Sequence, residues 1–372
     1  MEKIPFAKPS FKGNELKYVT ECITTGWISS IGSYVFKFEE AIASFHGMKH
    51  GIATSSGTTA LHLALAAINI KENDEVIIPD ITFIATANSV KYCNSLPKIV
   101  DVDSKDWNID ISLLEKAINK NTKAIIPVHI YGNPARMKQI MDIANKYNLA
   151  VIEDCAESFG SEIDNKKTGS FGLISCFSFF GNKIITTGEG GMCLTNDDAL
   201  AERMRMLRDH GMDKTKKYWH AVVGFNYRMT NVQAAIGLGQ FEQYEKFYEE
   251  RDFILKEYIS QLKNYPFIKF QETNSNKNVN WSTTVLISGI NQQNRNKIID
   301  ELSTAGIESR PFFYPIHVMP AYSDKIYHAS EFNTSIKLSE EGIVLPTFVG
   351  MTAQQIKYIC EQLIISIEKY LK

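Results

Sequence analysis

Short apolar runs alternate with helix-like segments in the first part of the chain, and this alternation restricts the fold more than any other feature. The runs that predict strands are His50 to Ala53, Glu75 to Pro79, Lys98 to Val102, Lys123 to Val128 and Ala150 to Glu153. The helical patterns between them are Thr58 to Ile68, Ile84 to Tyr92, Ile111 to Ile118 and Ala135 to Tyr147. Strands that alternate with helices form βαβ units. We therefore predict an α/β fold with a mostly parallel central sheet between helices.

The regular alternation of predicted strands and helices ends in the last third of the chain. The elements predicted there are one long, bent helix from Asn231 to Leu262, a strand at Trp281 to Ser288, a helix from Gln293 to Ala305, a strand at Ile307 to Phe313 and two final helices. A length of 372 residues is enough for two domains. We predict a large domain, residues 1–245, which includes an extended N-terminal arm, and a smaller C-terminal α+β domain, residues 246–372.

Composition excludes several classes of function. The net charge of −2 gives no support for binding to nucleic acid or to a membrane surface. No apolar run approaches the roughly 20 residues that span a bilayer, and the N-terminus lacks a signal-peptide core. The six cysteines include no CxxC pair, which indicates scattered thiols in a reducing cytoplasm and no metal site.

One lysine, Lys183, follows an aromatic strand and precedes a glycine-rich segment. The strand is Ser175 to Phe180, Gly181 and Asn182 break it, and the glycine-rich run Gly188 to Gly191 leads to a second apolar stretch. Burial disfavours the charged form of a lysine, and a neutral amine can form a Schiff base with an aldehyde. The alternative is a hairpin whose lysine points to water. The glycine run suggests room for close backbone packing, without a chemical role.

The segment Ser55 to Thr59 follows a strand and opens a helix. Free N–H groups at a helix N-terminus bind anions, and the hydroxyl groups of Ser55 and Thr58 add donors. The alternative is a plain serine N-cap. No Gly-Lys pair follows, so this is not a nucleoside triphosphate-binding loop.

A buried-type strand ends in two acids, Glu153 and Asp154. An acid at this position needs a partner, such as a metal ion, a cation or a protonated ring nitrogen. No cluster of histidine or cysteine in the nearby sequence completes a transition-metal site. The alternative is a structural acid that pairs with the backbone or with an arginine.

Ligands of parallel sheets collect at the carboxyl ends of the strands, where the anion-binding segment and Asp154 are both expected. Together with Lys183 they are the groups that pyridoxal phosphate requires: donors for its phosphate, an acid for its ring nitrogen and an amine for its aldehyde.

A series of motifs extends this interpretation over essentially the whole chain. They are FEEAIASFHG at 38–47, SSGTTALHLAL at 55–65, PDITFIATAN at 79–88, EDCAESFG at 153–160, SFFGNK at 178–183, TGEGGM at 187–192, GFNYRMTN at 224–231 and RPFFYPIH at 310–317. In these motifs the chain resembles the DegT/DnrJ/EryC1/StrS sugar-nucleotide aminotransferases, which have the fold of aspartate aminotransferase (fold type I). The resemblance implies pyridoxal 5'-phosphate as the cofactor, bound by the large domain.

By position, the resemblance assigns cofactor roles to eight residues. Lys183 matches the lysine that bonds to the cofactor aldehyde, Asp154 the partner of the ring nitrogen, and Phe83 the aromatic that stacks on the ring; Gly57, Thr58 and Ser178 match the phosphate donors. Glu157 matches a position, often glutamine in the family, that meets the ring hydroxyl. Asn226 matches a residue that reaches the neighbouring subunit's cofactor, which implies a homodimer with shared active sites and leaves a tetramer open.

The resemblance is greatest to a subgroup that aminates C4 of GDP-4-keto-6-deoxy-D-mannose with L-glutamate as donor, and it implies a cytoplasmic enzyme of amino sugar biosynthesis that serves O-antigen lipopolysaccharide. Candidates for the sugar-nucleotide pocket are Trp27, Ser29, Ser30, His220, Arg228, Tyr314 and His317. The alternative roles are core aromatics for Trp27 and Tyr314, a structural ion pair for Arg228 and a satisfied hydrogen-bonding group for His317.

Three other functions compete with this one. The acceptor could be a UDP- or dTDP-linked keto sugar, since those enzymes share the cofactor motifs. A related dehydratase carries histidine at the lysine position, and Lys183 argues against it. A gene regulator on this scaffold would need a DNA-binding module and a basic patch, and the sequence shows neither.

Overall fold

The computed structural model describes residues 3–213, 215–273, 275, 277–322 and 329–371. The first two residues of the predicted N-terminal arm lie outside this range.

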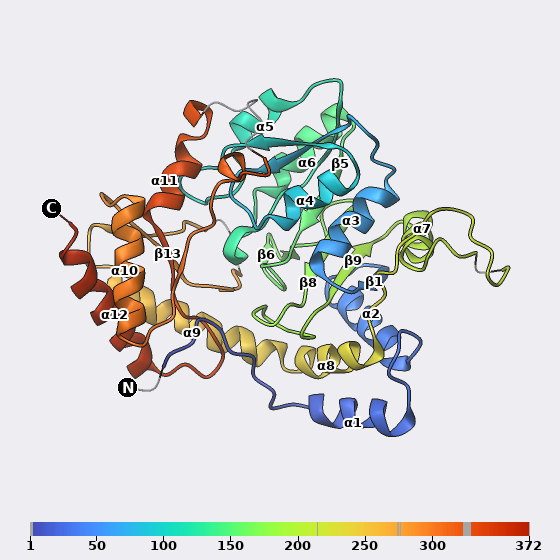
Figure 1. Ribbon diagram of the computed structural model, residues 1–372, viewed down its shortest axis with the longest axis horizontal. Coiled ribbons are helices and arrows are strands. Elements are labelled where there is room, and N and C mark those ends of the chain that lie inside the picture. The colour runs from blue at the N-terminus through green and yellow to red at the C-terminus, as the bar shows by residue number, and fades with distance from the viewer. Residues whose placement is uncertain (1–2, 214, 274, 276, 323–328, 372) are drawn as a thin grey trace.

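A seven-stranded sheet forms the centre of the molecule (Figure 1). In spatial order its strands are β1 (His50–Thr54), β9 (Gly191–Thr195), β8 (Ile174–Ser178), β5 (Ala150–Asp154), β4 (Thr122–Ile125), β2 (Glu75–Pro79) and β3 (Leu96–Val100). In this sheet β9 pairs antiparallel with both of its neighbours, whereas β8, β5, β4, β2 and β3 pair in parallel. The predicted mostly parallel sheet is therefore confirmed.

Helices cover both faces of the sheet (Figure 1). They are α2 (Ser33–Phe45), α3 (Gly57–Ala67), α4 (Ala85–Tyr92), α5 (Ile111–Ala117), α6 (Met137–Tyr147), α7 (Asp198–Arg208) and α8 (Asn231–Phe241), with α1 (Glu15–Thr25) packed on α8. Successive strand residues face opposite sides. On β1, Ala53 packs in the cluster that includes Phe38 of α2, and Ile52 packs in the cluster that includes Leu63 of α3.

Strand ends differ from the sequence prediction by a few residues. β3 ends at Val100 and not at Val102, because Val102 pairs with Ile109 in a separate antiparallel bridge. The pairing of Val102 with Ile109 depends on the turn between them, and the apolar pattern of a single strand gives no information about that turn.

The predicted single helix from 231 to 262 is wrong, because two helices occupy that range. α8 ends at Phe241 and α9 (Tyr244–Leu262) begins three residues later. At the break, the N–H of Gln243 bonds to the carbonyl of Gln240, three residues back, and its side chain amide binds Glu15 at 3.1 Å. Together the two helices run from beneath the large sheet to the C-terminal helices (Figure 1).

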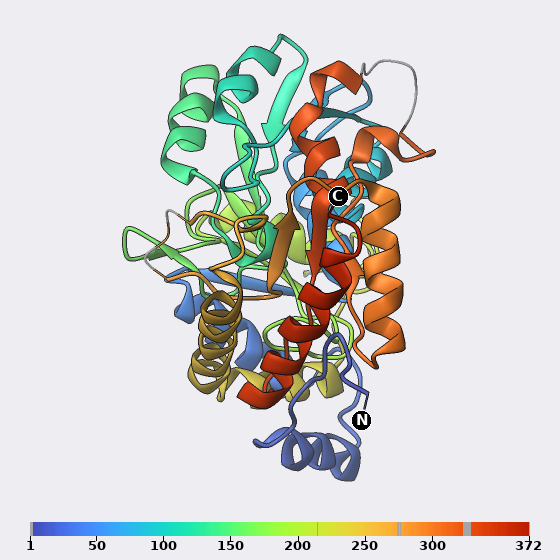
Figure 2. The ribbon, with the colours of Figure 1, turned by 90° about the vertical axis from the view of Figure 1, so that its left-hand side faces the viewer.

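The C-terminal part contains a four-stranded sheet and three helices. The strands, in spatial order, are β10 (Ile268–Phe270), β11 (Thr284–Ile287), β13 (Gly342–Val344) and β12 (Arg310–Pro311), and the helices are α10 (Gln292–Thr304), α11 (Asn333–Glu341) and α12 (Ala353–Glu368). Helices α10 and α12 run side by side (Figure 2). The strand predicted over 307–313 shrinks to two residues, because Ile307 pairs instead with Ile4 of the N-terminal arm.

We propose that the two predicted domains, 1–245 and 246–372, are the folding units of the chain. A separate apolar cluster supports this division, since its residues come from 254–371 and from the arm residue Ile4. None of the helices in the described part of the chain is both long and apolar enough to cross a lipid bilayer.

Candidate active site

A cavity of about 620 Å³ lies where the carboxyl ends of the central strands meet the C-terminal part. The predicted site residues that line it are Gly57, Thr58, Phe83, Asp154, Glu157, Ser178, Lys183 and Tyr314. These residues are far apart in sequence, and the sheet brings them together because each follows a strand or begins the next helix. A volume of this size holds a ligand as large as a cofactor.

Lys183 lies in the connection between β8 and β9, which pair as an antiparallel hairpin with Ser178 opposite Gly191. The hairpin that we considered as an alternative is therefore present, but its lysine points into the cavity and its side chain is only 12% exposed. Burial lowers the pKa of the Lys183 ammonium, while the carboxylates of Glu157 and Asp154 act in the opposite direction. A lysine with a lowered pKa can act as a nucleophile and as a base.

Asp154 ends β5 and is buried in the cavity wall. Its carboxylate accepts hydrogen bonds from the Thr86 hydroxyl at 2.8 Å and from the Ala156 N–H at 3.1 Å. Burial raises the pKa of Asp154, although both donors and Lys183 oppose the shift. No ion pair within 4.0 Å involves Asp154 among the described residues, so its carboxylate remains available to a cationic group of a ligand.

Glu157 is buried between Lys183 and a backbone donor. One carboxylate oxygen accepts the N–H of Tyr131 at 2.7 Å, and the other lies 3.9 Å from Nζ of Lys183. Burial raises the pKa of Glu157 to about 7, although Lys183 and the Tyr131 N–H act to lower it. Near neutral pH this acid can therefore either donate or accept a hydrogen bond.

The N-terminus of α3 is both capped and open to the cavity. The Ser56 hydroxyl accepts the N–H of Thr59 at 3.2 Å, which is the N-cap that we considered as an alternative. Gly57 and Thr58 line the cavity, and the first N–H groups of a helix have no partner inside it. A Cβ atom on Gly57 would come within 2.7 Å of Cβ of Ser178, so glycine lets that serine stand beside the helix N-terminus. The arrangement suits a phosphate group.

The glycine-rich run contributes close backbone packing next to this cradle. A Cβ atom on Gly191 would lie 2.3 Å from the carbonyl oxygen of Ser56 and 2.7 Å from the nitrogen of Gly57. Gly188 has a φ of +83°, a conformation that other residues rarely adopt. Glycine at these positions therefore lets β9 approach the anion-binding turn.

The chain is similar to known proteins both in sequence and in structure. Residues 9–364 match the model of the DegT/DnrJ/EryC1/StrS aminotransferase family. The GDP-perosamine synthase of Caulobacter vibrioides is 46% identical over 96% of both chains, and that of Escherichia coli O157:H7 is 43% identical over 98% of both. The PLP form of Spr1654 from Streptococcus pneumoniae superposes with a TM-score of 0.94 over 100% of both chains, at 25% identity.

The chain belongs to the DegT/DnrJ/EryC1/StrS aminotransferase family. It is a PLP-dependent aminotransferase with the fold of type I enzymes. The cavity fits this cofactor chemically, because it combines a buried amine, a carboxylate that forms no ion pair with the residues the structure describes, and a helix N-terminus open to an anion.

Several residues predicted for the aminotransferase site lie outside the cavity of the single chain. These are Trp27, Ser29, Ser30, Asn226, His220, Arg228 and His317. Arg228 forms an ion pair with Asp209 at 2.6 Å, and Nδ1 of His317 lies 2.7 Å from the buried carboxylate of Asp80. Within one chain, these two residues therefore have the structural roles that we considered as alternatives.

Other aminotransferase site residues were not anticipated. The cavity wall also contains Tyr131, Trp281, Arg310 and Phe313. Tyr131 has a φ of +54°, and its ring stacks 5.3 Å from that of Phe313. Arg310 and Phe313 lay inside the motif RPFFYPIH, and Thr86, which orients Asp154, lay inside PDITFIATAN, but the motifs assigned no role to these residues.

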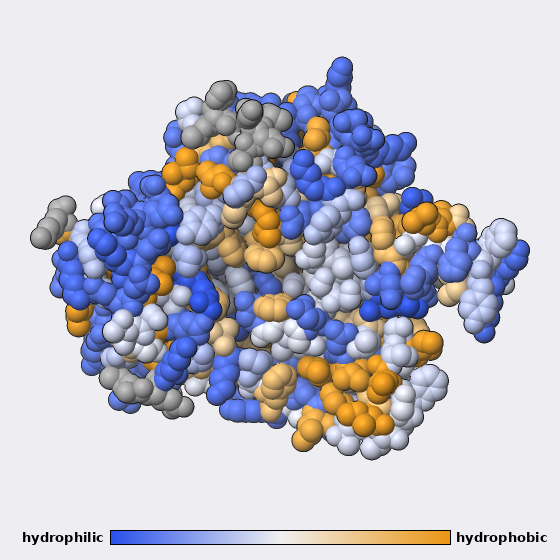
Figure 3. All heavy atoms as spheres, viewed as in Figure 1, coloured by the Kyte–Doolittle hydropathy of each residue, from blue (hydrophilic) through white to orange (hydrophobic). Residues whose placement is uncertain are grey.

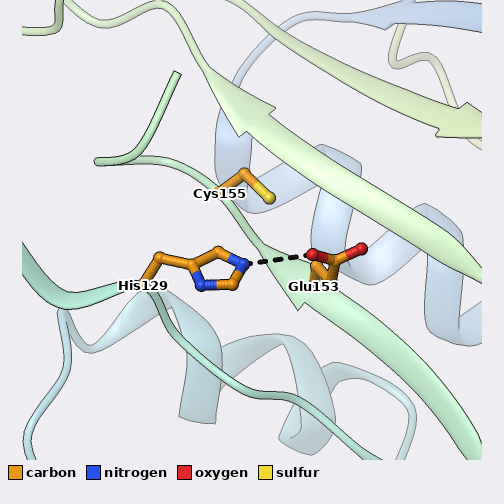
Figure 4. A group of neighbouring side chains, drawn as sticks. All are labelled: His129, Glu153 and Cys155. Carbon is orange, nitrogen blue, oxygen red and sulfur yellow. Dashed lines mark hydrogen bonds and ion pairs between the residues drawn. The ribbon is translucent and has the colours of Figure 1, made fainter. Parts of the chain in front are cut away.

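A second polar group lies directly behind Asp154. The side chains of His129, Glu153 and Cys155 approach within 4.8 Å of one another (Figure 4). The sequence prediction of no histidine or cysteine cluster that completes a metal site did not anticipate this grouping, because His129 follows the neighbouring strand β4. Such a trio resembles a metal site in composition.

Hydrogen bonds nevertheless occupy the ligand atoms of His129 and Glu153. Nδ1 of His129 accepts the N–H of Ala135 at 3.0 Å, so Nε2 carries the hydrogen and donates to Glu153 at 3.2 Å. Glu153 also accepts the N–H groups of Gly169, Phe171 and Gly172 at 2.7–2.8 Å. Although burial acts to raise the pKa of Glu153, these donors lower it overall. Glu153 and His129 therefore form a structural clamp: Glu153 fixes the loop 169–172 to β5, and His129 holds its carboxylate.

We expect Glu153→Gln to destabilise the protein by about 2–4 kcal/mol. The glutamine amide would turn an N–H group toward backbone donors that now bind a carboxylate. Denaturant unfolding of the purified protein measures the loss. Glu115→Gln is the control, because this exposed acid pairs with Lys146 on the surface and its loss should leave the free energy of unfolding nearly unchanged. Equal stability of the two variants would contradict the clamp.

Proposed function

We propose that the chain transfers the amino group of L-glutamate to C4 of a nucleotide-linked 4-keto-6-deoxy sugar. The proposed acceptor is GDP-4-keto-6-deoxy-D-mannose, and the product is GDP-perosamine. The observation that carries the reaction is the buried amine of Lys183, 3.9 Å from Glu157 in a cavity that also contains Asp154. The choice of acceptor is supported by identities of 46% and 43% to two GDP-perosamine synthases over nearly the whole chain.

Bound pyridoxal phosphate supplies an aldehyde that accepts the amino group and a ring that withdraws electrons from the reacting carbon. Lys183, whose amine lies in the cavity, would hold the cofactor through that aldehyde. When free, its amine would take the proton from the donor's α-carbon and pass it to the cofactor, and in the second half-reaction it would take a proton back from the cofactor and deliver it to C4 of the sugar. The carboxylate of Asp154 keeps the ring nitrogen protonated.

The remaining cofactor residues hold it in place. Gly57, Thr58 and Ser178 bind the phosphate, since they surround the open N-terminus of α3. Phe83 stacks on the ring from the cavity wall, where its side chain is 56% exposed. Glu157 meets the ring hydroxyl, and its pKa of about 7 lets it take either hydrogen-bonding role. Tyr314, which lines the same cavity, contacts the sugar nucleotide.

The test is to incubate the holoenzyme with L-glutamate and one nucleotide sugar at a time. The panel contains GDP-4-keto-6-deoxymannose and UDP- and dTDP-linked 4-keto-6-deoxy sugars, and mass spectrometry and NMR identify each product. We expect an amine at C4 of the GDP sugar, with kcat/KM highest for that acceptor. A product that lost oxygen without gaining nitrogen would indicate a dehydratase, and amination only of a UDP or dTDP sugar would reassign the acceptor.

A homodimer completes the site in this proposal. Exposed apolar side chains gather over α1 and α8 (Figure 3), and those from the α1–α2 region are Leu16, Ile23, Trp27, Ile28, Ile31 and Phe36. The loop after α7 extends away from the body of the molecule (Figure 1) and exposes 91% of Val223 and 78% of Tyr218. Asn226, at the base of that loop, would then reach the cofactor phosphate of the second copy, and Trp27, Ser29, Ser30, His220 and Arg228 would complete its sugar pocket.

Sedimentation equilibrium is expected to give twice the chain mass of 42.1 kDa. Phe36→Glu should shift the protein toward monomer, because it places a charge in the apolar surface, while Phe253→Glu on exposed α9 is the matched control. A wild-type protein that sediments as a monomer would contradict the shared site, and a fourfold mass would show that dimers pair.

We also propose a cytoplasmic location. All six cysteines are unpaired, and five of them are buried, as is usual in a reducing compartment. Cell fractionation tests this, and recovery of the protein outside the cytoplasm would contradict it.

A further inference from the structure

Trp281 comes from the C-terminal part of the chain and forms the wall of the cavity beside Lys183. Nζ of Lys183 lies 4.0 Å from the centre of the Trp281 ring. The indole N–H donates a hydrogen bond of 2.9 Å to the carbonyl of Asn182, the residue before that lysine. One tryptophan therefore contacts both the reactive nitrogen and the backbone that carries it.

The indole is itself held firmly. It is 5% exposed, and the ring of Tyr131 lies nearly parallel to it at 5.9 Å. The backbone carbonyl of Trp281 accepts a hydrogen bond of 2.8 Å from the buried guanidinium of Arg251 on α9. Tyr131 also donates its N–H to Glu157, which is the ion-pair partner of Lys183. The lysine, the tryptophan and the acid thus form one connected set.

We propose that Trp281 is a positioning residue that holds the Lys183 ammonium against its indole face whenever the lysine is not bonded to the cofactor. This inference rests on the proposed function of Lys183. The ring face carries partial negative charge, and its attraction for a cation is strongest where water is excluded. The charged groups that face Lys183 are Glu157 and Asp154, so the indole is the uncharged part of a three-sided site for the ammonium.

The contact matters because, within each half-reaction, the free lysine must hold a proton between its removal from one carbon and its delivery to another. Burial disfavours the ammonium, and a lysine that lost its proton too readily could not deliver it to the sugar. Trp281 offsets part of that burial through its ring face, and the bond from its indole N–H to Asn182 fixes the backbone that carries the lysine. Since Trp281 belongs to the C-terminal part, the position of that part relative to the large sheet also sets the behaviour of the lysine.

The experiment uses holoenzyme with excess L-glutamate, which converts the cofactor to its amino form and leaves Lys183 free. An amine-acylating reagent labels the neutral lysine, and mass spectrometry of the Lys183 peptide gives the extent of labelling against pH. Trp281→Leu removes the ring face, while Trp281→Phe keeps a weaker face and loses the indole N–H. Tyr147→Leu is the control, because it removes a ring that lies 5.1 Å from the surface Lys146.

We expect Trp281→Leu to raise the labelling rate of Lys183 about tenfold at a pH below its midpoint, because the ammonium loses a stabilising partner and its pKa falls. Trp281→Phe should lie between Trp281→Leu and the wild type, and Tyr147→Leu should match the wild type. Both Trp281 variants should lower kcat more than they change KM for the sugar. An unchanged midpoint in Trp281→Leu with intact cofactor absorbance would overturn the proposal. The proposal would also be overturned if Trp281→Leu and Trp281→Phe shifted the labelling midpoint equally and both lost the folded state. That result would indicate a purely structural role for Trp281.

The two hypotheses fail in different ways. A Lys183→Ala protein that still transaminates would contradict the proposed role of the lysine, whatever the labelling of Lys183 in the Trp281 variants shows. A shifted midpoint in Trp281→Leu would still show that the indole binds the ammonium.

Discussion

Lys183→Ala should lower the rate of amino transfer from L-glutamate by at least about 10³-fold. The variant lacks both the amine that bonds to the cofactor and the base that moves the proton, and no other lysine lines the cavity in the described part of the chain. Cofactor should remain bound through its phosphate but without the absorbance of the lysine-linked form. Single-turnover assays with glutamate, followed by visible absorbance, measure both effects.

The matched control for this variant is Lys256→Ala. Lys256 lies on the exposed side of α9, where it pairs with Asp252 at 2.6 Å, so its loss should leave the rate within about twofold of wild type. Wild-type turnover by Lys183→Ala would mean that another group moves the proton, and the assignment of the site would be wrong.

Asp154→Asn should lower kcat by about 10²–10³-fold while the fold is retained. Asparagine has nearly the same shape and can keep the bond from the Thr86 hydroxyl, but it carries no charge to hold a proton on the ring nitrogen. The ring then withdraws electrons less effectively, and the proton of the donor's α-carbon becomes harder to remove. The rate of the glutamate half-reaction and the visible spectrum of the holoenzyme report this change.

Asp198→Asn is the control for Asp154→Asn. The Asp198 side chain is 69% exposed and pairs with Lys49 and His50 on the surface, so the substitution should leave the half-reaction unchanged. Comparison of the unfolding midpoints of the two variants shows whether Asp154→Asn also lowers the stability of the fold. A normal rate in Asp154→Asn would contradict the role of its charge.

Element positions followed from local pattern, because the central strands are buried along their length and appear as short apolar runs, whereas burial on helices repeats about every 3.6 residues. The α7 prediction, Asp198 to Arg208, matched in full because an aspartate cap precedes the helix. The break between α8 and α9 and the short β12 could not be predicted in the same way. Both depend on distant partners, Glu15 for the break and Ile4 for the strand.

The cofactor-side residues were predictable for a related reason. Gly57 opens α3, Phe83 follows β2 and Asp154 ends β5, so the α/β pattern placed these three at one edge of the sheet, whereas Glu157 and Ser178 were assigned by the family resemblance. The candidates for the sugar-nucleotide pocket do not share such a position at a strand end or helix start. Tyr314 lines the cavity, whereas His220 lies on the extended loop and its ring binds the carbonyl of His210.

By itself, the sequence determined which chemical groups would meet: an amine at Lys183, an acid at Asp154 and an open helix N-terminus at Gly57. Periodicity and strand-end position are local properties, so they can be read without coordinates. Only the tertiary structure decided the state of those groups, because charge depends on what surrounds a side chain. It buried Lys183 beneath Trp281 and beside Glu157, and it thereby turned a lysine in a hairpin into one with a lowered pKa and a defined position.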